Sequence, residues 1–307
     1  MTTAPSRPLV VIALGGNALL QRTQSLDDAT QRANARSAAE SIAELAHHVD
    51  LVVTHGNGPQ VGLLALQQQH PSWPLDILVA ETQGMVGYVL ASELDRALGT
   101  SIACCVITRV VVDPNDSAFD EPTKPIGPMY PSQVELQRAA AGREWASGPD
   151  GTGYRRLVAS PSPLEILELE LIRSMVTQGF IPVCCGGGGI PIARHALGEP
   201  SGVEAVIDKD ATASLLAIEL EADGLLLLTD VEGVYSAYGT PEQRLLTGID
   251  VGTSDLTEYA AGSMRPKLAA AARFASQRNG TSIIGQLDDA LAMWQGHAGT
   301  NVRSHAR

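Results

Sequence analysis

The sequence predicts an α/β protein organised around a parallel β-sheet. Short apolar runs, typical of strands buried on both faces, end in glycine-rich turns, and helical periodicity follows them. This strand–turn–helix unit occurs twice within residues 8–70, which indicates parallel strands joined by right-handed crossovers. A chain of 307 residues is long enough to bury a large core, as one domain or as two lobes.

The first two units each contain a glycine turn that follows a strand. Their strands, turns and helices are expected at residues 8–14, 15–17 and 27–48, and at residues 51–54, 55–59 and 60–70. Gly56, Gly58 and Gly62 in the second unit resemble a dinucleotide-binding loop. Their spacing is one residue longer than G-x-G-x-x-G, and Pro59 restricts the backbone there, so the sequence argues against such a site.

The middle of the chain leaves this regular pattern. A helix is expected over residues 75–98, and a strand over residues 101–112 that breaks near Arg109. Residues 113–160 are rich in Pro and Gly and hold one helical patch at 132–141. A segment this long without core-type apolar runs predicts an excursion from the sheet, such as a lid or a small subdomain.

Regular structure resumes after residue 160. Ser162 and Glu165 have the spacing of a capping box, with Pro163 at the first helical position, which predicts a helix that ends at Gly179. Further strands are expected at residues 180–185, 224–228, 281–284 and 300–303, and further helices from residue 208, at 253–261 and from residue 262. No internal repeat is evident in the sequence.

Composition narrows the class of partner. The net charge is −13, which argues against nucleic acid and anionic membrane surfaces as partners. No apolar run approaches the length of a membrane span, and no signal-peptide pattern begins the chain, so we expect a cytoplasmic protein. The four Cys form two adjacent pairs at 104–105 and 184–185, without metal-site spacing, and we expect buried reduced thiols.

The three lysines of the chain draw attention because they are so few. Lys and Arg together number 21, and the lysines are Lys124, Lys209 and Lys267. Where Arg serves for ordinary solvation, a retained Lys suggests a site that needs a compact ammonium group. Lys209 opens a helix between Asp208 and Asp210, and these carboxylates can orient its charge.

The glycine turns indicate a phosphate site. Turns at residues 15–16, 56–58 and 186–189 follow strands, so parallel pairing would gather them at one edge of the sheet as a surface of backbone N–H donors. No P-loop pattern occurs, so these turns, together with Lys209 and Lys267, would have to hold the phosphates. Phosphoryl transfer needs mainly positioning and charge stabilisation, which two ammonium groups and N–H donors can supply.

Other catalytic designs find little support. The sequence shows neither a Ser–His–Asp order nor a nucleophile elbow, and no metal-ligand spacing. His55 lies in a glycine turn, where we interpret it as a hydrogen-bonding residue of the turn.

Eight motifs distributed in order along the chain resemble those of carbamate kinase, a branch of the amino acid kinase superfamily. They are ALGGNAL (13–19), THGNGPQVG (54–62), VVVDPNDSAF (110–119), PTKPIGP (122–128), CGGGGIP (185–191), VEAVIDKD (203–210), LTDVEGVY (228–235) and SMRPK (263–267). The match covers nearly the whole chain, and PTKPIGP and GGGGIP separate carbamate kinases from their superfamily relatives. The chain departs from the usual motifs near Tyr154, Ala159 and Gly285.

The resemblance implies a three-layer α/β/α sandwich with an open, mainly parallel eight-stranded sheet, a protruding subdomain at about residues 113–160, and a homodimer. It implies a single amino acid kinase domain, with residues 1–182 on the carbamate side and residues 183–307 on the nucleotide side. The implied reaction is reversible phosphoryl transfer between carbamoyl phosphate and MgADP, giving carbamate and ATP. Mg²⁺ would arrive with the nucleotide rather than on protein side chains.

The resemblance also implies roles for individual residues. Lys209 and Lys267 would flank the transferring phosphoryl group, Asp210 would position them, and Lys124 would reach in from the subdomain. The phosphate and carbamate pocket would be lined by Gly15, Gly16, Asn17, Gly56, Asn57, Gly58, Gly187 and Gly188. The nucleotide would be bordered by Thr229, Asp230, Tyr235, Met264 and Pro266.

Two alternatives stay open from the sequence. The first is a superfamily relative that phosphorylates another small carboxylate or phosphate. The second is a nucleotide sensor without catalytic activity. Retention of Lys209 and Lys267 argues against the sensor, because a sensor could replace them with Arg in this arginine-rich chain.

Overall fold

The computed structural model describes residues 7–19, 24, 27–67, 73–194, 199–252, 259, 264–278 and 280–304. Its largest sheet has eight strands in the order β15-β17-β16-β12-β1-β2-β9-β3. In that order their bounds are Gly248–Asp250, Thr300–Arg303, Thr281–Gln286, Gly224–Thr229, Leu9–Leu14, Asp50–His55, Ile181–Val183 and Ala103–Cys105. The expected eight-stranded sheet is confirmed.

The central strand β1 aligns the ends of its neighbours. It pairs parallel with β2 and β12, and Leu14 lies level with His55 on one side and Leu228 on the other. The turns that follow these three strands therefore begin at the same edge of the sheet. The β16–β17 pair is antiparallel, so the sheet is mainly rather than wholly parallel.

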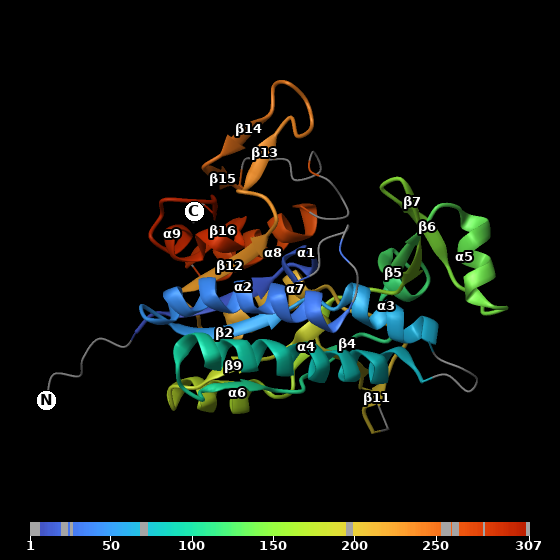
Figure 1. The fold of residues 1–307 in the computed structure, drawn as a ribbon, viewed down its shortest axis with the longest axis horizontal. Helices are drawn as coiled ribbons and strands as arrows, with labels where there is room; N and C mark the ends of the chain where they lie inside the picture. The colour runs from blue at the N-terminus through green and yellow to red at the C-terminus, as the bar shows by residue number, and fades with distance from the viewer. Residues whose placement is uncertain are drawn as a thin grey trace, which may run out of the picture.

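Helices cover both faces of this sheet (Figure 1). Alternate residues of β1 point to opposite faces: Val10 and Ile12 pack with α2, α4 and α9, and Val11 and Ala13 with α6, α7 and α8. These helices span Asp28–Ala46, Leu75–Leu98 and Ala290–Trp294 on the first face, and Leu169–Thr177, Lys209–Glu219 and Met264–Arg278 on the second. The arrangement confirms the three-layer sandwich.

Smaller elements surround the sandwich. A second sheet has the order β11-β10-β4-β8, with bounds Ser201–Gly202, Ile190–Ala193, Arg109–Val112 and Pro163–Ile166. The hairpin β13–β14 (Val234–Ser236 and Arg244–Leu246) rises from the top of the view in Figure 1. Short helices are α1 (Gly16–Leu19), α3 (Gly58–Gln67) and the 3₁₀ turns at Ser117–Phe119, Gly186–Gly188 and Leu287–Asp289.

The proline-rich excursion forms a separate subdomain. Its sheet has the order β5-β7-β6, with bounds Lys124–Tyr130, Gly153–Val158 and Ser147–Asp150, and helix α5 (Gln133–Ala140) packs beside it. Figure 1 shows this unit to the side of the layers, next to α3. The two bodies approach closely where Gly62 meets Gly127, because a Cβ at Gly62 would lie 1.9 Å from the Gly127 Cα.

One element was wrongly predicted. The capping-box pattern at Ser162 does not begin a helix, because residues 163–166 form strand β8, which pairs antiparallel with β4. Helix α6 begins only at Leu169, and Glu168 before it bonds to the Arg109 backbone N–H rather than capping the helix. Pairing with a distant strand has overridden a local signal.

Other expectations agree with the structure or lie outside it. The break near Arg109 is real, since β3 and β4 belong to different sheets. All four cysteines are free thiols, buried at Cys184 and Cys185 and partly buried at the other pair. The helix expected at 253–261 falls largely on residues that the structure does not describe. In the described ranges, no helix is both long and apolar enough to cross a membrane.

Candidate active site

Three glycine turns converge at the carboxyl edge of the main sheet. Gly15 N–H donates to Leu228 O at 2.9 Å and Gly56 N–H donates to Leu14 O at 3.1 Å, so both turns are fixed to strand ends. A Cβ at Gly56 would lie 3.2 Å from the Gly16 Cα, and one at Gly187 would lie 2.1 Å from the Asn57 amide nitrogen. The backbone is therefore packed too closely here for larger residues, and the predicted clustering of glycine turns is confirmed.

A buried carboxylate joins two of the three lysines. Asp210 Oδ1 accepts from Lys209 Nζ at 2.5 Å, and its Oδ2 accepts from Lys267 Nζ at 3.0 Å. The Asp210 side chain is 4% exposed, and the lysines are 13% and 10% exposed. Lys209 opens α7 and Lys267 lies in the first turn of α8, so two helix N-termini bring their partial positive charge to the same place.

Burial and charge act against each other in this cluster. Burial lowers the pKa of Lys209 to about 8. The charge of Asp210 opposes this shift, and the repulsion of Lys267 adds to it. Burial also opposes the charge of Lys267, but Asp210 outweighs it and raises the pKa of that ammonium. The two ammonium groups in turn hold the pKa of Asp210 below its ordinary value despite its burial. The result is a fixed cluster with one excess positive charge.

The third lysine enters from the subdomain. Lys124, the first residue of β5, donates from Nζ to Asp208 Oδ2 at 2.9 Å. The other oxygen of Asp208 accepts the N–H groups of Asp210 and Ala211 at 3.0 and 3.1 Å, so this carboxylate also caps α7. Burial opposes ionisation, but the charges of Lys124 and Lys209 outweigh it and lower the pKa of Asp208. Asp208 thus links subdomain, helix and lysine cluster, a role that its N-cap position alone did not reveal.

Helix α4 supplies a second set of residues that sequence reasoning missed. The buried Thr82 hydroxyl accepts from Asn57 Nδ2 at 2.8 Å and donates to Val79 O. The Gln83 amide bonds both backbone groups of Thr108, whose hydroxyl accepts the Cys185 N–H before the four glycines. These contacts orient one site side chain and anchor the glycine loop. The Thr-Gln pair in the sequence carries no signal for either role.

The residues expected near a nucleotide lie on three elements. Thr229 ends β12 and Asp230 follows it, and a Cβ at Gly15 would lie 3.6 Å from the Thr229 Cα. Tyr235 lies on β13 and its hydroxyl donates to Glu232 Oε2 at 2.7 Å. Met264 and Pro266 form the first turn of α8, directly before Lys267. The structure thus links Thr229 to the glycine turns and the α8 pair to the lysine cluster, whereas Tyr235 lies on the projecting hairpin.

His55 behaves as the hydrogen-bonding turn residue that the sequence suggested. Burial lowers its pKa to about 4, so the ring is neutral at physiological pH, and Nδ1–H donates to Gly56 O at 3.0 Å. Gly186 lies against the ring, since a Cβ there would be 2.4 Å from Nε2. The imidazole therefore separates and supports two glycine turns.

Comparison with known proteins is consistent with this geometry. The model of the amino acid kinase family matches residues 8–286. The carbamate kinase of Haemophilus influenzae is 43% identical over 298 residues, covering 95% of this chain and 96% of its own. That of Rhizobium meliloti is 44% identical over 302 residues, covering 96% and 93%. The chain belongs to the carbamate kinases of the amino acid kinase family.

Solved structures of this family have the same fold. Carbamate kinase from Giardia lamblia bound to citric acid matches with a TM-score of 0.88 at 37% identity, over 97% of this chain and 98% of that one. The same enzyme bound to AMP-PNP matches with a TM-score of 0.83 at 39% identity, over 97% and 98%. These matches extend over the sheet, both helix layers and the subdomain of this kinase.

Proposed function

We propose that this chain catalyses reversible phosphoryl transfer between carbamoyl phosphate and ADP, giving carbamate and ATP. The observation that carries the proposal is the placement of Lys209 and Lys267 on the two oxygens of Asp210, beside the glycine turns. Two ammonium groups held in one rigid arrangement can stabilise charge on the equatorial oxygens of a transferring phosphoryl group. Carbamate kinase relatives at 43–44% identity support the choice of substrates.

The reaction needs little covalent chemistry from the protein itself. The bond between phosphorus and the carbamate oxygen breaks, a bond from phosphorus to a β-phosphate oxygen of ADP forms, and carbamate leaves as an anion. No proton changes place, so no general base is needed, and the site offers ammonium and N–H donors instead. Lys209 and Lys267 would contact the phosphoryl group, and Asp210 would fix their separation.

The remaining residue roles follow the same geometry. Lys124 would reach the acyl phosphate from the subdomain, exchanging its bond to Asp208 for one to the substrate. The phosphate and carbamate pocket would be formed by the glycine turns with Asn57, held in orientation by Thr82. Residues 1–182 would then form the carbamate side, and residues 183–307 the nucleotide side through Thr229, Asp230, Tyr235, Met264 and Pro266.

Mg²⁺ would be bound through the nucleotide phosphates. Asp208 and Asp210 already accept from ammonium and backbone donors, which leaves the site carboxylates poorly suited to a dedicated metal cage. Among the described residues, no group of three or more His, Cys, Asp or Glu could hold an ion. When bound, the ion would neutralise phosphate charge, which suits the way Mg²⁺ usually binds with substrate phosphates.

We further propose a cytoplasmic homodimer. Ile77, Met85 and Tyr88 recur at helical spacing along α4 with exposures of 39%, 39% and 59%, and Ile107 beside them is 45% exposed. Exposed apolar side chains on one face of a helix are typical of a protein interface, and a second copy of the chain would cover them. Size-exclusion chromatography with Tyr88→Glu tests this, since a dimer at the wild-type elution volume would contradict the assignment. The free thiols fit a reducing compartment.

The decisive experiment measures ATP formation from carbamoyl phosphate and ADP by wild type and Lys209→Ala. We expect activity in the wild type and its loss in the variant, with both folded by thermal melt. A panel of small carboxylates and phosphates with ATP, read as ADP formation, tests the alternative of another acceptor. Nucleotide binding without turnover of any substrate would instead indicate the sensor.

A further inference from the structure

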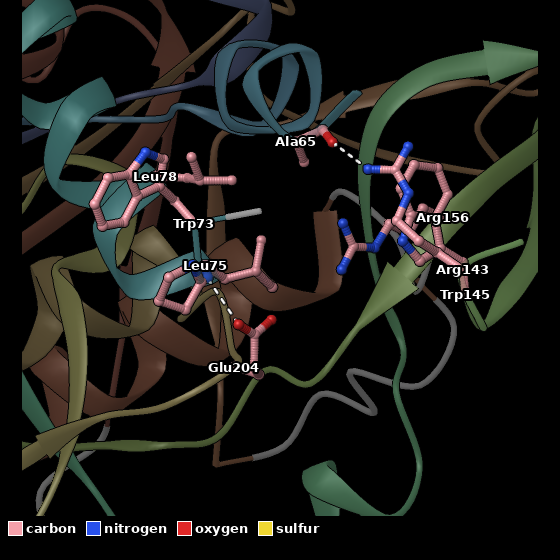
Figure 2. Close-up of a pocket in the computed structure, with 9 residues that line it drawn as sticks. Ala65, Trp73, Leu75, Leu78, Arg143, Trp145, Arg156 and Glu204 are labelled. Carbon is pink, nitrogen blue, oxygen red and sulfur yellow. Dashed lines mark hydrogen bonds between the residues drawn. The ribbon is translucent and has the colours of Figure 1, made fainter. Parts of the chain in front are cut away.

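A second pocket lies away from the lysine cluster, between the subdomain and the start of α4. Its volume is about 150 Å³ and Figure 2 shows it open at the centre of the view. Its lining includes Trp73, Leu75 and Leu78 from the main body and Trp145 and Arg156 from the subdomain. None of its lining residues belongs to the phosphoryl site.

Two side chains of opposite charge, Arg156 and Glu204, line the pocket without forming an ion pair with each other in the described part of the chain. The Arg156 guanidinium lies 4.6 Å from the centre of the Trp145 ring and, within the described part of the chain, makes neither a hydrogen bond nor an ion pair. Glu204 Oε1 accepts the Leu75 N–H at 3.0 Å, while its Oε2 has no partner among the described residues. In Figure 2 the two groups approach the cavity from different sides.

The neighbouring Arg143 differs from Arg156 because two of its N–H groups already donate to backbone carbonyls. Its Nε bonds to Ala140 O at 2.9 Å, and its Nη1 bonds to Ala65 O at 3.0 Å. Arg143 therefore ties the subdomain to α3, whereas Arg156 retains free N–H donors. Burial lowers the pKa of Arg156, while the charge of Glu204 across the pocket raises it. A partly desolvated guanidinium with free donors favours an anionic group as its partner.

We propose that this pocket binds a small zwitterion, an α-amino acid with a short apolar side chain. Its carboxylate bonds to Arg156, its ammonium bonds to Glu204 Oε2, and its side chain packs against the exposed Trp73 ring. A simple anion would bring its charge near Glu204, and a simple amine would bring its charge near Arg156. A molecule with both charges satisfies both walls.

Such a ligand joins the two bodies of the protein. Arg156 and Trp145 belong to the subdomain, and Leu75 and Glu204 to the main body. The same subdomain carries Lys124 at the start of β5. A bound amino acid therefore favours the docked position of the subdomain and changes the apparent affinity for the substrate that Lys124 contacts, which makes the pocket an effector site.

The test is a titration of the full-length protein with L-valine, followed by calorimetry and by tryptophan fluorescence. Two of the three tryptophans in the chain line the pocket, so fluorescence reports on it directly. Isovalerate and isobutylamine, which keep the apolar part and one charge each, are titrated in parallel. We expect L-valine to bind, and each analogue to bind at least about tenfold more weakly, as expected when one charged hydrogen bond is lost.

Variants locate the binding. Glu204→Gln removes the negative charge but keeps an acceptor for the Leu75 N–H. Arg156→Gln removes the free guanidinium. Each variant should weaken L-valine binding at least about tenfold. Arg138→Gln and Glu242→Gln, which change exposed charges outside the pocket, should leave it within about twofold. Thermal melts check that the variants are folded. The comparison of L-valine with isovalerate and isobutylamine uses the wild-type protein alone, so it does not depend on the folding of any variant.

The proposal is overturned if L-valine gives neither heat nor a fluorescence change up to tens of millimolar, a range that still detects weak ligands. Equal binding of isovalerate and L-valine would show a plain anion site. Unchanged L-valine binding in both pocket variants would place the ligand elsewhere. All three outcomes are independent of turnover, so they separate this inference from the proposed reaction.

Discussion

The main body and the subdomain hold their site lysines in different ways. In the main body, Lys209 and Lys267 share a carboxylate that is 4% exposed, and both begin or closely follow a helix start. In the subdomain, Lys124 reaches across to Asp208 through one ion pair whose side chains are 22% and 30% exposed. The first arrangement is fixed by buried charge. The second is an ion pair of the kind that water and substrate can replace.

The backbone near Lys209 and Lys267 is also held differently from the backbone of the subdomain that carries Lys124. The glycine turns are held by strand ends, by the His55 ring and by a hydrogen-bond chain from α4 through Thr108. The subdomain has its own sheet, and it meets the main body at the Gly62–Gly127 crossing and through the Arg143 bond to Ala65 O. The main body therefore holds its two lysines in one rigid arrangement, and we predict that the subdomain moves over the acceptor site.

The largest effect is expected from Lys209→Arg and Lys267→Arg. A guanidinium is wider than an ammonium and would displace the reacting oxygens, where an error of about 1 Å can cost on the order of a hundredfold. We expect kcat to fall by at least roughly that factor in each variant, with little change in melting temperature. Steady-state ATP formation beside a thermal melt measures both.

The matched control is Lys124→Arg. Because Lys124 forms a part-exposed ion pair, we expect the longer side chain to adjust, with kcat within about threefold of wild type. If either main-body Arg variant kept near-wild-type kcat, that lysine would be a bystander. If all three variants lost the same factor, the two parts of the site would not differ as we argue.

A smaller effect is expected from Lys124→Ala. If Lys124 contacts the acyl phosphate as proposed, its loss should raise the KM for carbamoyl phosphate about tenfold and leave the KM for ADP within about twofold. Initial rates with one substrate varied at a time separate the two constants, and Arg138→Ala on the exposed face of α5 is the control. Equal changes in both KM values would contradict a role confined to the acceptor side.

Thr82→Val tests the fixed part of the site from its supporting layer. The change keeps the shape but removes the acceptor of Asn57 Nδ2, which lies 2.8 Å away in a buried position. We expect kcat/KM to fall about tenfold and the free energy of unfolding to fall by about 1–3 kcal/mol, since a buried donor loses its partner. Thr82→Ser, which keeps the hydroxyl, should restore most of the activity. Loss of stability without loss of kcat/KM would mean that Asn57 does not need this orientation.

The sequence predicted the fixed part of the site better than its support, for a physical reason. Strand ends, glycine turns and lone lysines are local features, and parallel pairing alone brings them to one edge, so Gly56 and Lys209 could be placed together without coordinates. The bonds of Thr82 to Asn57 and of Gln83 to Thr108 cross 25 residues of chain and depend on how α4 packs. No local pattern encodes such contacts.

The same limit explains the wrong helix start. Ser162, Pro163 and Glu165 satisfy every local rule of a capping box, yet residues 163–166 pair with β4. That strand lies some fifty residues earlier in the chain, and its edge becomes available only when the second sheet forms. By contrast, α4 keeps its expected bounds, Leu75–Leu98, because a long apolar stripe that ends at a glycine in the left-handed region needs no distant partner.

The smallest effect, about twofold, is expected from raising the pH to 8, and it concerns the fixed part of the site alone. The pKa of Lys209 is about 8 in the free protein because burial disfavours its charge. If the reaction needs the ammonium, kcat/KM for carbamoyl phosphate should be about half its plateau value at pH 8 and fall further above it. Bound phosphate stabilises the ammonium, so the break in kcat should lie at higher pH. Profiles with both substrates varied across pH 6 to 10 measure the two breaks.

Titration of Lys209 should raise its contribution to the free energy of unfolding over the pH range in which kcat/KM falls. A loss of activity caused by titration can therefore be told apart from one caused by unfolding. Between about pH 8 and the ordinary lysine pKa of 10.5, the unfolded chain holds a proton at Lys209 that the folded chain has released. The contribution of this residue to the free energy of unfolding therefore rises with pH there. We expect Lys209→Met, which cannot titrate, to remove that rise in denaturant titrations at pH 7.5 and 9.5. A wild-type kcat/KM that stays flat to pH 10 would show that the ammonium keeps its proton, and that Asp210 outweighs burial at Lys209 as it does at Lys267.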